Sequence, residues 1–401
     1  MFDGIYVQNY IISMKKILFK KFIKDTLKLF ITMVFVLGLI VWVIQAVNFL
    51  DFVTEDGHSF YVYFLYSTLN FPKIINRIIP FAFMISLFYQ VLEYEKKNEL
   101  LIFWINGITK KQFINVIVTY SFLITLFQVF LSAYVSPISQ HKAKQFIANS
   151  TNDFFPSLIK EGKFIDAISG LTIFIESKNL DGNFKNIFLS NNFNAGNNKK
   201  TLKKSEIIYA KNGILINDEK SRYFDLLEGK IIRNDGSKIQ EFSFEKIRYD
   251  LTEYTSNANK FPKIQEAPSL FLVKCVYYKF TNKLQDVKDI RLGSKNYGCT
   301  EGGFKIVLEE FLQRLFKPFY ILLLGLIVSL LILKSKDQIN YNRNKKFIFA
   351  ASFILIVISE LSLRYSAQSI SGTLFFISFP LLIFITVYLF IYRKIYYYQG
   401  Y

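Results

Sequence analysis

The chain has 401 residues, of which 52% are hydrophobic and 18% aromatic, and its formal net charge is +18. This composition is too apolar for an ordinary soluble domain. Because the lysines flank apolar runs, the charge indicates a membrane rather than a nucleic acid. The alternative is that part of the charge reflects a general bias of the sequence toward Lys, Asn, Ile and Phe.

Six apolar stretches are long enough to cross a bilayer core of about 30 Å, which takes roughly 20 helical residues. They gather at the two ends of the chain and leave a polar middle. The second stretch is unusually long, so it is either one tilted helix kinked at Pro72 or Pro80, or a short interfacial helix followed by a span. The six predicted spans are 29–50, 60–92, 113–135, 318–333, 347–363 and 373–392.

The short segments that flank the spans divide into a basic set and a set without lysine or arginine. Basic residues lie before the first span, between the second and third, between the fourth and fifth, and after the sixth, whereas DFVTEDGHS and YSAQSISG have none. By the positive-inside rule, both termini are expected in the cytoplasm and the polar middle outside it. The first apolar run is too long for a cleavable signal peptide. Met14, followed by two lysines, is a plausible translation start.

Between the second and third spans, residues 94–106 have the spacing of a short amphipathic helix. Leu100, Phe103 and Trp104 fall on one face at i, i+3 and i+4. This face either lies at the lipid interface with Trp104 as an anchor, or docks into a groove on a cytoplasmic protein with Glu99 as the polar contact.

The end of this helix is marked by local signals. Gly107 is placed to end it as the residue after the C-cap. Thr109 and Gln112 then have the spacing of a capping box, which starts the third span. The chain is therefore expected to form a short helix, stop, and begin again as a membrane helix.

The polar middle has the pattern of β-strands from about residue 160 to 251. Alternating apolar residues are separated by Asp181-Gly182, Asn212-Gly213 and Asp235-Gly236, which favour hairpin turns. We expect six to ten short antiparallel strands in a sandwich or open barrel, with a jelly-roll-like fold. The apolar alternation changes phase near Glu245-Lys246, which indicates a β-bulge.

Other residues of the middle segment leave alternatives open. Phe242 and Phe244 share a strand face, where they either fill a core or line an apolar groove for lipid chains. The segment 266–303 is either helical or an extended linker. Cys275 and Cys299 can pair if this segment faces an oxidising compartment.

The segment NELLIFWINGITKKQF, residues 98–113, resembles a motif of the LptF/LptG family of lipopolysaccharide export permeases. Glu99, Gly107 and Thr109 match the family's Glu, Gly and hydroxyl positions. In that family the segment is the coupling helix that sits on an ATPase subunit. The resemblance therefore implies that Glu99, Leu100, Phe103, Trp104, Gly107 and Thr109 form a partner-binding site.

Two further segments carry the resemblance. RIIPFAFM places Pro80 where the family has a proline before the coupling helix, and EFLQRLFKPFYILLL matches the entry to the fourth span through Glu310, Arg314 and Pro318. The layout is also similar: a membrane half at 1–136, an extracytoplasmic β-domain at 137–304 and a second membrane half at 305–401. The wording of GKFIDAISGLTIFIESKNLDG, residues 162–182, slightly favours the LptF-like branch.

The resemblance implies a permease subunit of the bacterial inner membrane rather than an enzyme. The sequence has no P-loop, HExxH or GxSxG motif, so ATP and Mg²⁺ are expected on a separate ATPase dimer and no cofactor on this chain. The implied partners are a homologous permease, that ATPase and periplasmic bridge proteins with similar β-domains. The implied substrate is lipopolysaccharide, extracted from the outer leaflet of the inner membrane. We expect neither a metal site nor nucleic-acid binding.

Phosphate groups on such a lipid require cations. Lys73 and Arg77 lie at i, i+4 near the outer part of the second span, and Arg314 and Lys317 at i, i+3 near the outer start of the fourth. These four side chains either meet the lipid phosphates or extend to the membrane interface without a ligand.

Two other functions compete with export. A secondary transporter requires ionisable residues or broken helices near the middle of the membrane, and Glu360, expected to pair with Arg364, is the main such residue in the spans. A membrane-anchored adaptor would bind a partner through its β-domain, but six spans exceed what an anchor needs.

Overall fold

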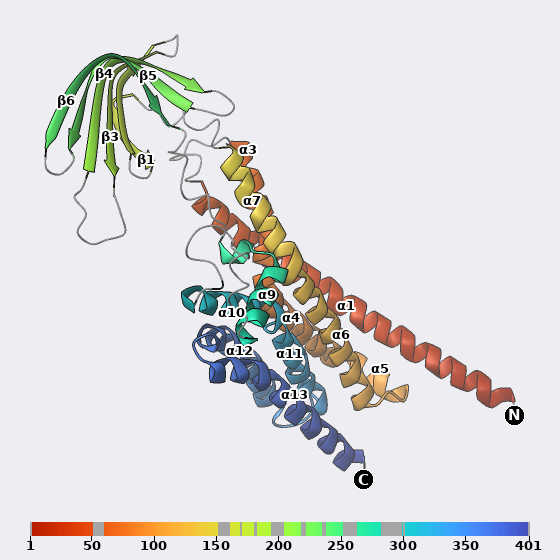
Figure 1. Cartoon of the computed structure of the whole chain (residues 1–401). Coiled ribbons are helices and arrows are strands. Elements are labelled where there is room, and N and C mark those ends of the chain that lie inside the picture. Colours follow the sequence, from red (N-terminus) through yellow and green to blue (C-terminus); the bar gives the residue numbers. More distant parts are fainter. Residues whose placement is uncertain are drawn as a thin grey trace. The chain divides into compact units, whose positions relative to one another are not determined.

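The structure is a computed structural model that describes residues 2–50, 60–150, 161–168, 171–179, 183–193, 204–217, 222–234, 238–251, 263–281, 299 and 301–399. The chain divides into two compact units. One, the helical unit, comprises residues 1–45, 69–141 and 262–401, and the other, which holds the sheet, comprises residues 46–68 and 142–261. Figure 1 shows the elements of both. The expectation about the start of the chain concerns Met1 and side chains before Met14, which lie outside the described part.

Helices make up most of the structure. Within the described part of the chain, five of them are long and apolar enough to cross a membrane, and a sixth candidate is the pair Gly303–Leu315 and Phe319–Leu333, bent by 44° at its break. The helical elements are α1 (Phe2–Asn48), α3 (Phe60–Leu69), α4 (Phe71–Lys96), α5 (Glu99–Ile105), α6 (Lys110–Phe130), the π-helix η1 (Leu131–Val135), α7 (Ser136–Ser150), the 3-10 turn η4 (Ile264–Glu266), α9 (Ser269–Phe280), α10 (Glu301–Leu315), α11 (Phe319–Ser329), the 3-10 turn η6 (Leu330–Leu333), α12 (Tyr341–Ser366) and α13 (Ile370–Gln399).

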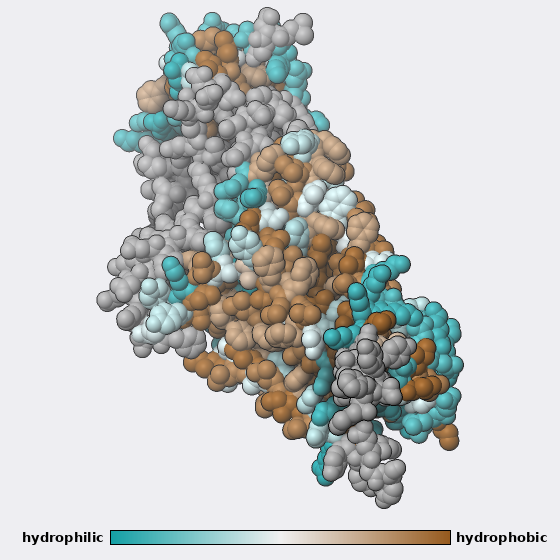
Figure 2. Space-filling model, turned by 90° about the vertical axis from the view of Figure 1, so that its right-hand side faces the viewer, coloured by the Kyte–Doolittle hydropathy of each residue, from teal (hydrophilic) through white to brown (hydrophobic). Residues whose placement is uncertain are grey.

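The predicted spans agree with these helices. The long second stretch divides at Asn70 into α3 and α4, directly before Pro72, while Pro80 stays inside α4. Proline is tolerated in the first turn of a helix because its missing N–H has no partner there in any case. Many large apolar side chains on α1, α6, α12 and α13 are exposed. Figure 2 shows a broad apolar surface on one face of the helices, as expected of a polytopic membrane protein.

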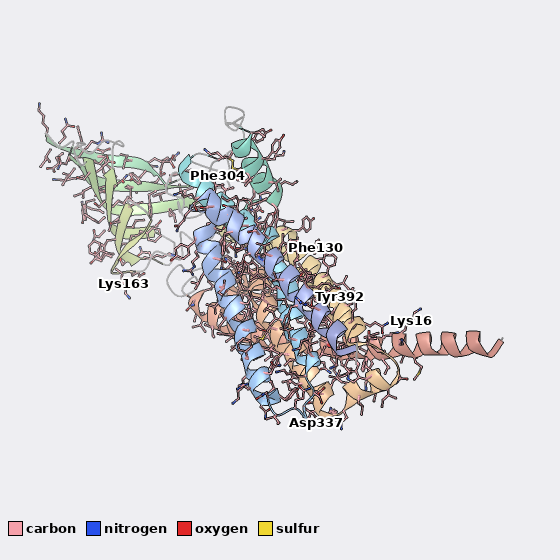
Figure 3. All side chains as sticks on the ribbon, turned by 90° about the horizontal axis from the view of Figure 1, so that it is seen from below. Lys16, Phe130, Lys163, Phe304, Asp337 and Tyr392 are labelled. Carbon is pink, nitrogen blue, oxygen red and sulfur yellow. A yellow bond between two sulfur atoms is a disulfide. The ribbon has the colours of Figure 1, made fainter. Side chains whose placement is uncertain are left out.

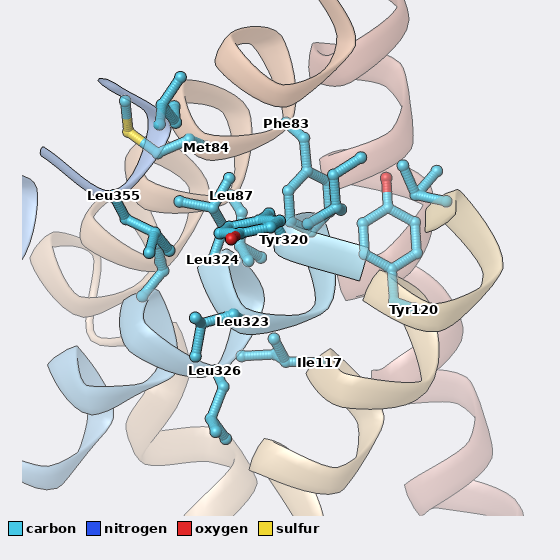
Figure 4. Packing of buried hydrophobic residues seen from close by; sticks show 14 of the residues in the cluster. Phe83, Met84, Leu87, Ile117, Tyr120, Tyr320, Leu323, Leu324, Leu326 and Leu355 are labelled. Carbon is cyan, nitrogen blue, oxygen red and sulfur yellow. The ribbon is translucent and has the colours of Figure 1, made fainter. Parts of the chain in front are cut away.

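The core of the helical unit is built around α11. Figure 4 shows Tyr320, Leu323 and Leu324 of this helix among side chains of α4 and α6, including Phe83 and Ile117. At Gly325 the α11 backbone comes so close to α6 that an added Cβ would lie 1.9 Å from the Ser121 Oγ. Small residues at such crossings let membrane helices approach closely, because dispersion contacts rather than hydrophobic burial drive their packing.

Six antiparallel strands in chain order form the sheet as far as the structure describes it. Its strands are β1 (Lys163–Ile168), β2 (Leu171–Lys178), β3 (Asn183–Phe193), β4 (Lys204–Asn217), β5 (Arg222–Asn234) and β6 (Ile239–Asp250). The strands that flank Asp181-Gly182 and Asp235-Gly236 pair antiparallel, while the two dipeptides themselves lie outside the described residues. The order is that of an up-and-down meander, so the described strands form one open curved sheet rather than two packed sheets (Figure 1).

Asn212-Gly213 does not form a turn, contrary to the sequence prediction. Both residues lie inside β4, where Gly213 faces Phe184 and Leu226 on the neighbouring strands. A Cβ on Gly213 would lie 2.3 Å from the Ile187 side chain, so the glycine is explained by close side-chain packing. As a result, the structure has one long strand where we expected two short ones.

The phase change near Glu245 is present, but it is not a bulge between two strands. β5 and β6 keep one register from the pair Tyr223 and Asp250 to the pair Asn234 and Ile239. The neighbouring strands change their buried face at the same height. The residues that fall between ladder pairs there are Glu176, Asn186, Lys211, Glu228 and Glu245, and Asn186 and Glu228 have positive φ. Because all these strands shift together, their pairing is preserved.

Candidate functional site

The helix between the second and third spans is shorter than predicted. α4 continues to Lys96, Asn98 adopts a left-handed conformation with φ 60°, and α5 begins at Glu99. Gly107 has φ 70° and ends the turn as expected. The capping box is formed: the Gln112 amide donates to the Thr109 Oγ1 at 3.2 Å, and the Thr109 amide donates to the Gln112 Oε1 at 3.1 Å. The bends at Asn98 and Gly107 therefore make α5 a separate short helix between α4 and α6.

α5 is apolar on both faces, and the predicted docking face is the buried one. Leu100 and Phe103 are 3% and 2% exposed and belong to the chain's own core, so they are not available to a partner. Trp104 is half-buried, with its ring 5.8 Å from that of Phe113. The opposite face, which we call the outer face of α5, consists of Leu101, Ile102 and Ile105, all exposed.

The first part of α1 holds α5 in place. The Lys21 Nζ lies 3.0 Å from the Glu99 Oε2, and the Lys15 Nζ donates to the Gly107 carbonyl at 3.0 Å. Between them, the Phe19 ring packs 5.7 Å from that of Phe103. The N-terminal lysines were predicted only to set the orientation, but two of them also tie α5 to α1.

The segment between η6 and α12 contacts the same region. The Lys336 amide donates to the Glu95 Oε1 at 2.7 Å, and its Nζ donates to the Asn98 Oδ1. The Lys110 Nζ donates to the Leu333 carbonyl at 3.2 Å. Figure 3 labels Asp337 in this segment toward one end of the helical unit and Phe304 on α10 toward the other. A displacement of α5 would therefore reach both membrane halves.

A polar pocket lies at the end of the helical unit remote from α5, where several helices are interrupted. Its lining includes Lys73, Asn76 and Arg77 of α4 with Glu310 of α10 and Gln265 of η4. The π-helix η1 and the bend between α10 and α11 border it. π-helices are rare and frequently occur at functional sites.

Arg314 is fully committed within this pocket. The residue is 2% exposed, and its guanidinium forms an ion pair with Glu310 at 2.8 Å. It also donates to the carbonyls of Ala267, Ile264 and Gln265 and to the Ser269 Oγ. These contacts use all the N–H groups of the guanidinium. Arg314 therefore has a structural role and no free donor for a phosphate.

The other three predicted cations differ in their availability. Lys317 pairs with Glu360, so the expected pair of Glu360 with Arg364 is not formed. Lys73 donates to the Gln265 Oε1 at 3.0 Å, whereas Arg77 is exposed and has no hydrogen-bond partner among the described residues. The Asn76 Oδ1 in the same pocket is buried without a donor. The structure therefore leaves Arg77 and Lys73 as the cations best placed for an anion.

Phe242 and Phe244 stand on the edge strand β6. Phe244 packs against the sheet core beside Gly229, where a Cβ would lie 2.4 Å from its ring. Phe242 is opposite Ile231 and stays 52% exposed. One phenylalanine thus fills the core, and the other lies uncovered at the open edge of the described sheet.

Cys275 and Cys299 form a disulfide. They lie in a small core with Phe271, Leu272 and Val307 that joins α9 to α10. Of the two alternatives for this segment, the described residues favour a helix, since LFLVKCVYYKF falls within α9.

Comparison with known proteins agrees with this arrangement. The family described as "Lipopolysaccharide export system permease LptF/LptG" matches residues 20–394. A curated relative from Rickettsia prowazekii (strain Madrid E), "Uncharacterized protein RP871", is 24% identical over 239 residues. That match covers 59% of this chain and 64% of the relative, so the chain spans less than two thirds of the relative's length.

Proposed function

The chain belongs to the LptF/LptG family of lipopolysaccharide export permeases, and from this we propose that it is one permease subunit of an ATP-driven lipopolysaccharide exporter. It pairs with a homologous permease in the bacterial inner membrane, and a separate cytoplasmic ATPase dimer supplies the energy. The lipid leaves the outer leaflet, passes the β-domain and continues to a periplasmic bridge of similar domains.

The observation that carries this proposal is the exposed face of α5. Leu101, Ile102 and Ile105 form an exposed apolar face on α5, next to the acidic Glu99. Backbone bends at both ends of α5 separate it from α4 and α6. A groove on a partner protein that accepts an apolar helix face, with a basic rim for Glu99, is the matching surface. Closure of the ATPase dimer would press on α5, and the contacts of Glu99 with Lys21 and of the N-cap residue Asn98 with Lys336 would pass the movement to α1 and toward α12.

The basic flanks and the disulfide support the same orientation. The segments around α5 and between η6 and α12 are rich in lysine, which by the positive-inside rule supports a cytoplasmic location for them. Disulfides persist in the periplasm but not in the reducing cytosol, so the bond between Cys275 and Cys299 is consistent with a periplasmic α9.

We propose that Arg77 and Lys73 bind the phosphate groups of the lipid. Arg77 has no intrachain partner among the described residues, and Lys73 would exchange only an amide oxygen for a phosphate. Charge-assisted bonds to phosphate are stronger than bonds to a neutral amide. For the acyl chains we retain Phe242 with Phe244 behind it on the face of the open sheet.

Co-purification tests the docking of α5. Ile105, 75% exposed on its outer face, is changed to Asp in the tagged permease, and the bound ATPase is quantified by blotting. A charge in the apolar contact would cost several kcal/mol because the groove cannot solvate it, so we expect at least tenfold less ATPase. Glu99→Lys should also weaken the complex.

The matched control is Ile339→Asp, which changes a fully exposed isoleucine in the segment between η6 and α12. It should leave the amount of bound ATPase unchanged. If Ile105→Asp retains the ATPase together with normal hydrolysis, α5 is not the docking helix.

The polar pocket keeps secondary transport as a second candidate. It joins ionisable side chains, Lys73, Arg77 and Glu310, to interrupted helices, as ion-coupled sites do, although it lies at the end of the helical unit and such sites lie near the middle of the membrane. Reconstitution separates the two functions: export should require ATP and the ATPase, and lipid movement driven by a proton or sodium gradient without ATP would favour this second candidate.

A further inference from the structure

α9 has a second face that the core does not use. Its inner face, with Phe271, Leu272 and Cys275, packs into the small core around the disulfide. Leu270, Val273 and Tyr277 on the opposite side are 73%, 42% and 62% exposed. Their i, i+3, i+7 spacing places them on one stripe of the helix. We call these three residues the outer stripe of α9.

Several bonds fix α9 to the membrane helices. The Ser269 Oγ, in its first turn, donates to the Ala133 carbonyl in η1. Arg314 binds the carbonyls of Ile264, Gln265 and Ala267 directly before it, and the disulfide ties Cys275 to Cys299, ahead of α10. α9 therefore packs beside α10 at a defined height (Figure 1).

That height corresponds to a membrane surface. Lys110, at the opposite end of α6, and Ala133 are 23 residues apart, which spans about 35 Å at the helical rise of 1.5 Å per residue. The hydrocarbon core is about 30 Å thick. With Lys110 at one interface, the bond from Ser269 to Ala133 places the start of α9 at the other.

We propose that α9 is an interfacial helix that inserts its outer stripe into the lipid leaflet at the end of the helical unit remote from α5. Leu270 and Val273 would reach the acyl boundary, and Tyr277 would sit among the headgroups, where tyrosine is enriched. Lys274 is exposed beside the stripe and would extend its ammonium toward lipid phosphates. This inference rests on the membrane-spanning helices and not on lipopolysaccharide export.

A second protein is the other candidate to cover the stripe, and its size argues against that. Stable protein interfaces use roughly 20–30 residues a side, with few lysines at their centre. The outer stripe has three residues and a lysine at its margin. A shallow apolar strip with one cation suits a phospholipid surface.

Spin labels on the full-length chain test the depth of α9. Leu270, Val273 and Tyr277 are replaced one at a time by cysteine and labelled, in vesicles of phosphatidylethanolamine and phosphatidylglycerol. Both native cysteines are paired, so only the introduced thiol reacts without reductant. Collision rates with oxygen, which partitions into lipid, and with a water-soluble nickel chelate are then measured.

Two reference positions calibrate the rates. Leu123→Cys, on an exposed apolar position in the middle of α6, gives the lipid value, and Ser243→Cys, exposed on β6, gives the water value. At Leu270 and Val273 we expect nickel collisions at least threefold below the Ser243 value and oxygen collisions near the Leu123 value. Lys274→Cys should fall between the references.

Two results would overturn the proposal. Nickel collisions at Leu270 and Val273 equal to those at Ser243 would place the stripe in water. Low rates with both reagents would show that a protein surface covers it. Neither result would affect the ATPase pull-down, so this proposal and the proposed function fail separately.

Discussion

Arg314 illustrates how one side chain can carry the link between the membrane helices and the segment that follows the sheet. Its guanidinium joins Glu310 on α10 to three carbonyls and a hydroxyl that precede or begin α9. Arg314 belongs to the motif that resembles the family's entry to the fourth span. Its contacts within the chain explain an arginine at this position without a ligand. A planar donor with several N–H groups is required there, which lysine does not provide.

Arg314→Lys should destabilise the protein although it keeps the charge. The lysine ammonium reaches one cluster of acceptors but not both Glu310 and the carbonyls of Ile264 and Gln265, which are left buried without donors. At about 1–3 kcal/mol for each of the two carbonyls, we expect a loss of roughly 2–6 kcal/mol. Thermal unfolding in detergent, followed by size-exclusion chromatography, measures it.

The control is Arg343→Lys at an exposed position of α12, which should change stability by less than about 0.5 kcal/mol. Equal melting temperatures for both variants would contradict the structural role of Arg314.

In the sheet, Asp225 is expected to make the free energy of unfolding depend on pH in the acidic range. The hydrogen bond from Arg248, at 2.9 Å, lowers the pKa of the Asp225 carboxyl, and Lys246 at 3.3 Å adds to it, although burial opposes the shift. Because the folded pKa is below the unfolded value of about 3.9, the stabilisation is complete above that value and is lost as pH falls through the folded pKa.

Hydrogen exchange of β5 and β6 checks this expectation. After correction for intrinsic rates, protection should fall as the pH is lowered below about 4, and Asp225→Asn should remove most of that dependence while lowering protection at neutral pH. An unchanged pH profile in the Asn variant would show that other carboxylates govern the sheet.

At the scale of elements, the packing of α11 on α6 gives a sharp expectation. A methyl group at Gly325 would lie 1.9 Å from the Ser121 Oγ and 2.8 Å from its Cβ, so the two helices must separate. Gly325→Ala should cost roughly 1–3 kcal/mol, as other overpacked cores do. Melting temperatures of the single variants and of the double variant with Ser121→Gly measure the coupling between the two positions.

Gly38→Ala in α1 is the matched control, since its methyl would lie 3.5 Å from the Phe71 ring, an ordinary contact. There the better helix propensity of alanine should raise stability slightly. If Gly325→Ala behaves like Gly38→Ala, the close crossing of α6 and α11 is wrong.

The comparison of α5 with its sequence shows what periodicity can and cannot predict. The spacing placed Leu100, Phe103 and Trp104 on one face, and they do share it. However, α5 is apolar all round, and periodicity does not say which apolar face meets the chain's own core. The ring contacts of Phe103 with α1 and α6 decide this, and such long-range contacts leave no local signal.

The same limit explains the results for the strands. Local turn chemistry separated β2 from β3 and β5 from β6 at Asp181-Gly182 and Asp235-Gly236, and these strands do pair antiparallel. It failed at Asn212-Gly213, where the neighbouring Ile187 requires a glycine inside β4. A glycine can be required either by a tight turn or by close packing inside a strand. Only the position of the adjacent strand tells which of the two applies.

Across the whole molecule, the contacts of the helical unit concentrate at two levels. At one level α5 is tied to α1, and Glu95 and Asn98 directly before it are tied to the segment before α12. At the other, Arg314 and the disulfide join α9, α10 and η4 beside the polar pocket. α6 runs between the two levels and, with α4, connects the helix proposed to receive a push from an ATPase with the cations proposed to hold the lipid.

This arrangement requires the two levels to face opposite sides of the membrane, which thiol labelling can measure. Ser335→Cys before α12 and Ser243→Cys on β6 are each treated with a membrane-impermeant maleimide in intact spheroplasts. Because the native cysteines are paired, background labelling should be low. We expect Ser243→Cys to react at once and Ser335→Cys only after lysis, since lysine-rich flanks remain in the cytoplasm. The reverse pattern would place α5 in the periplasm, where no ATPase could reach it, and the proposed coupling would fail.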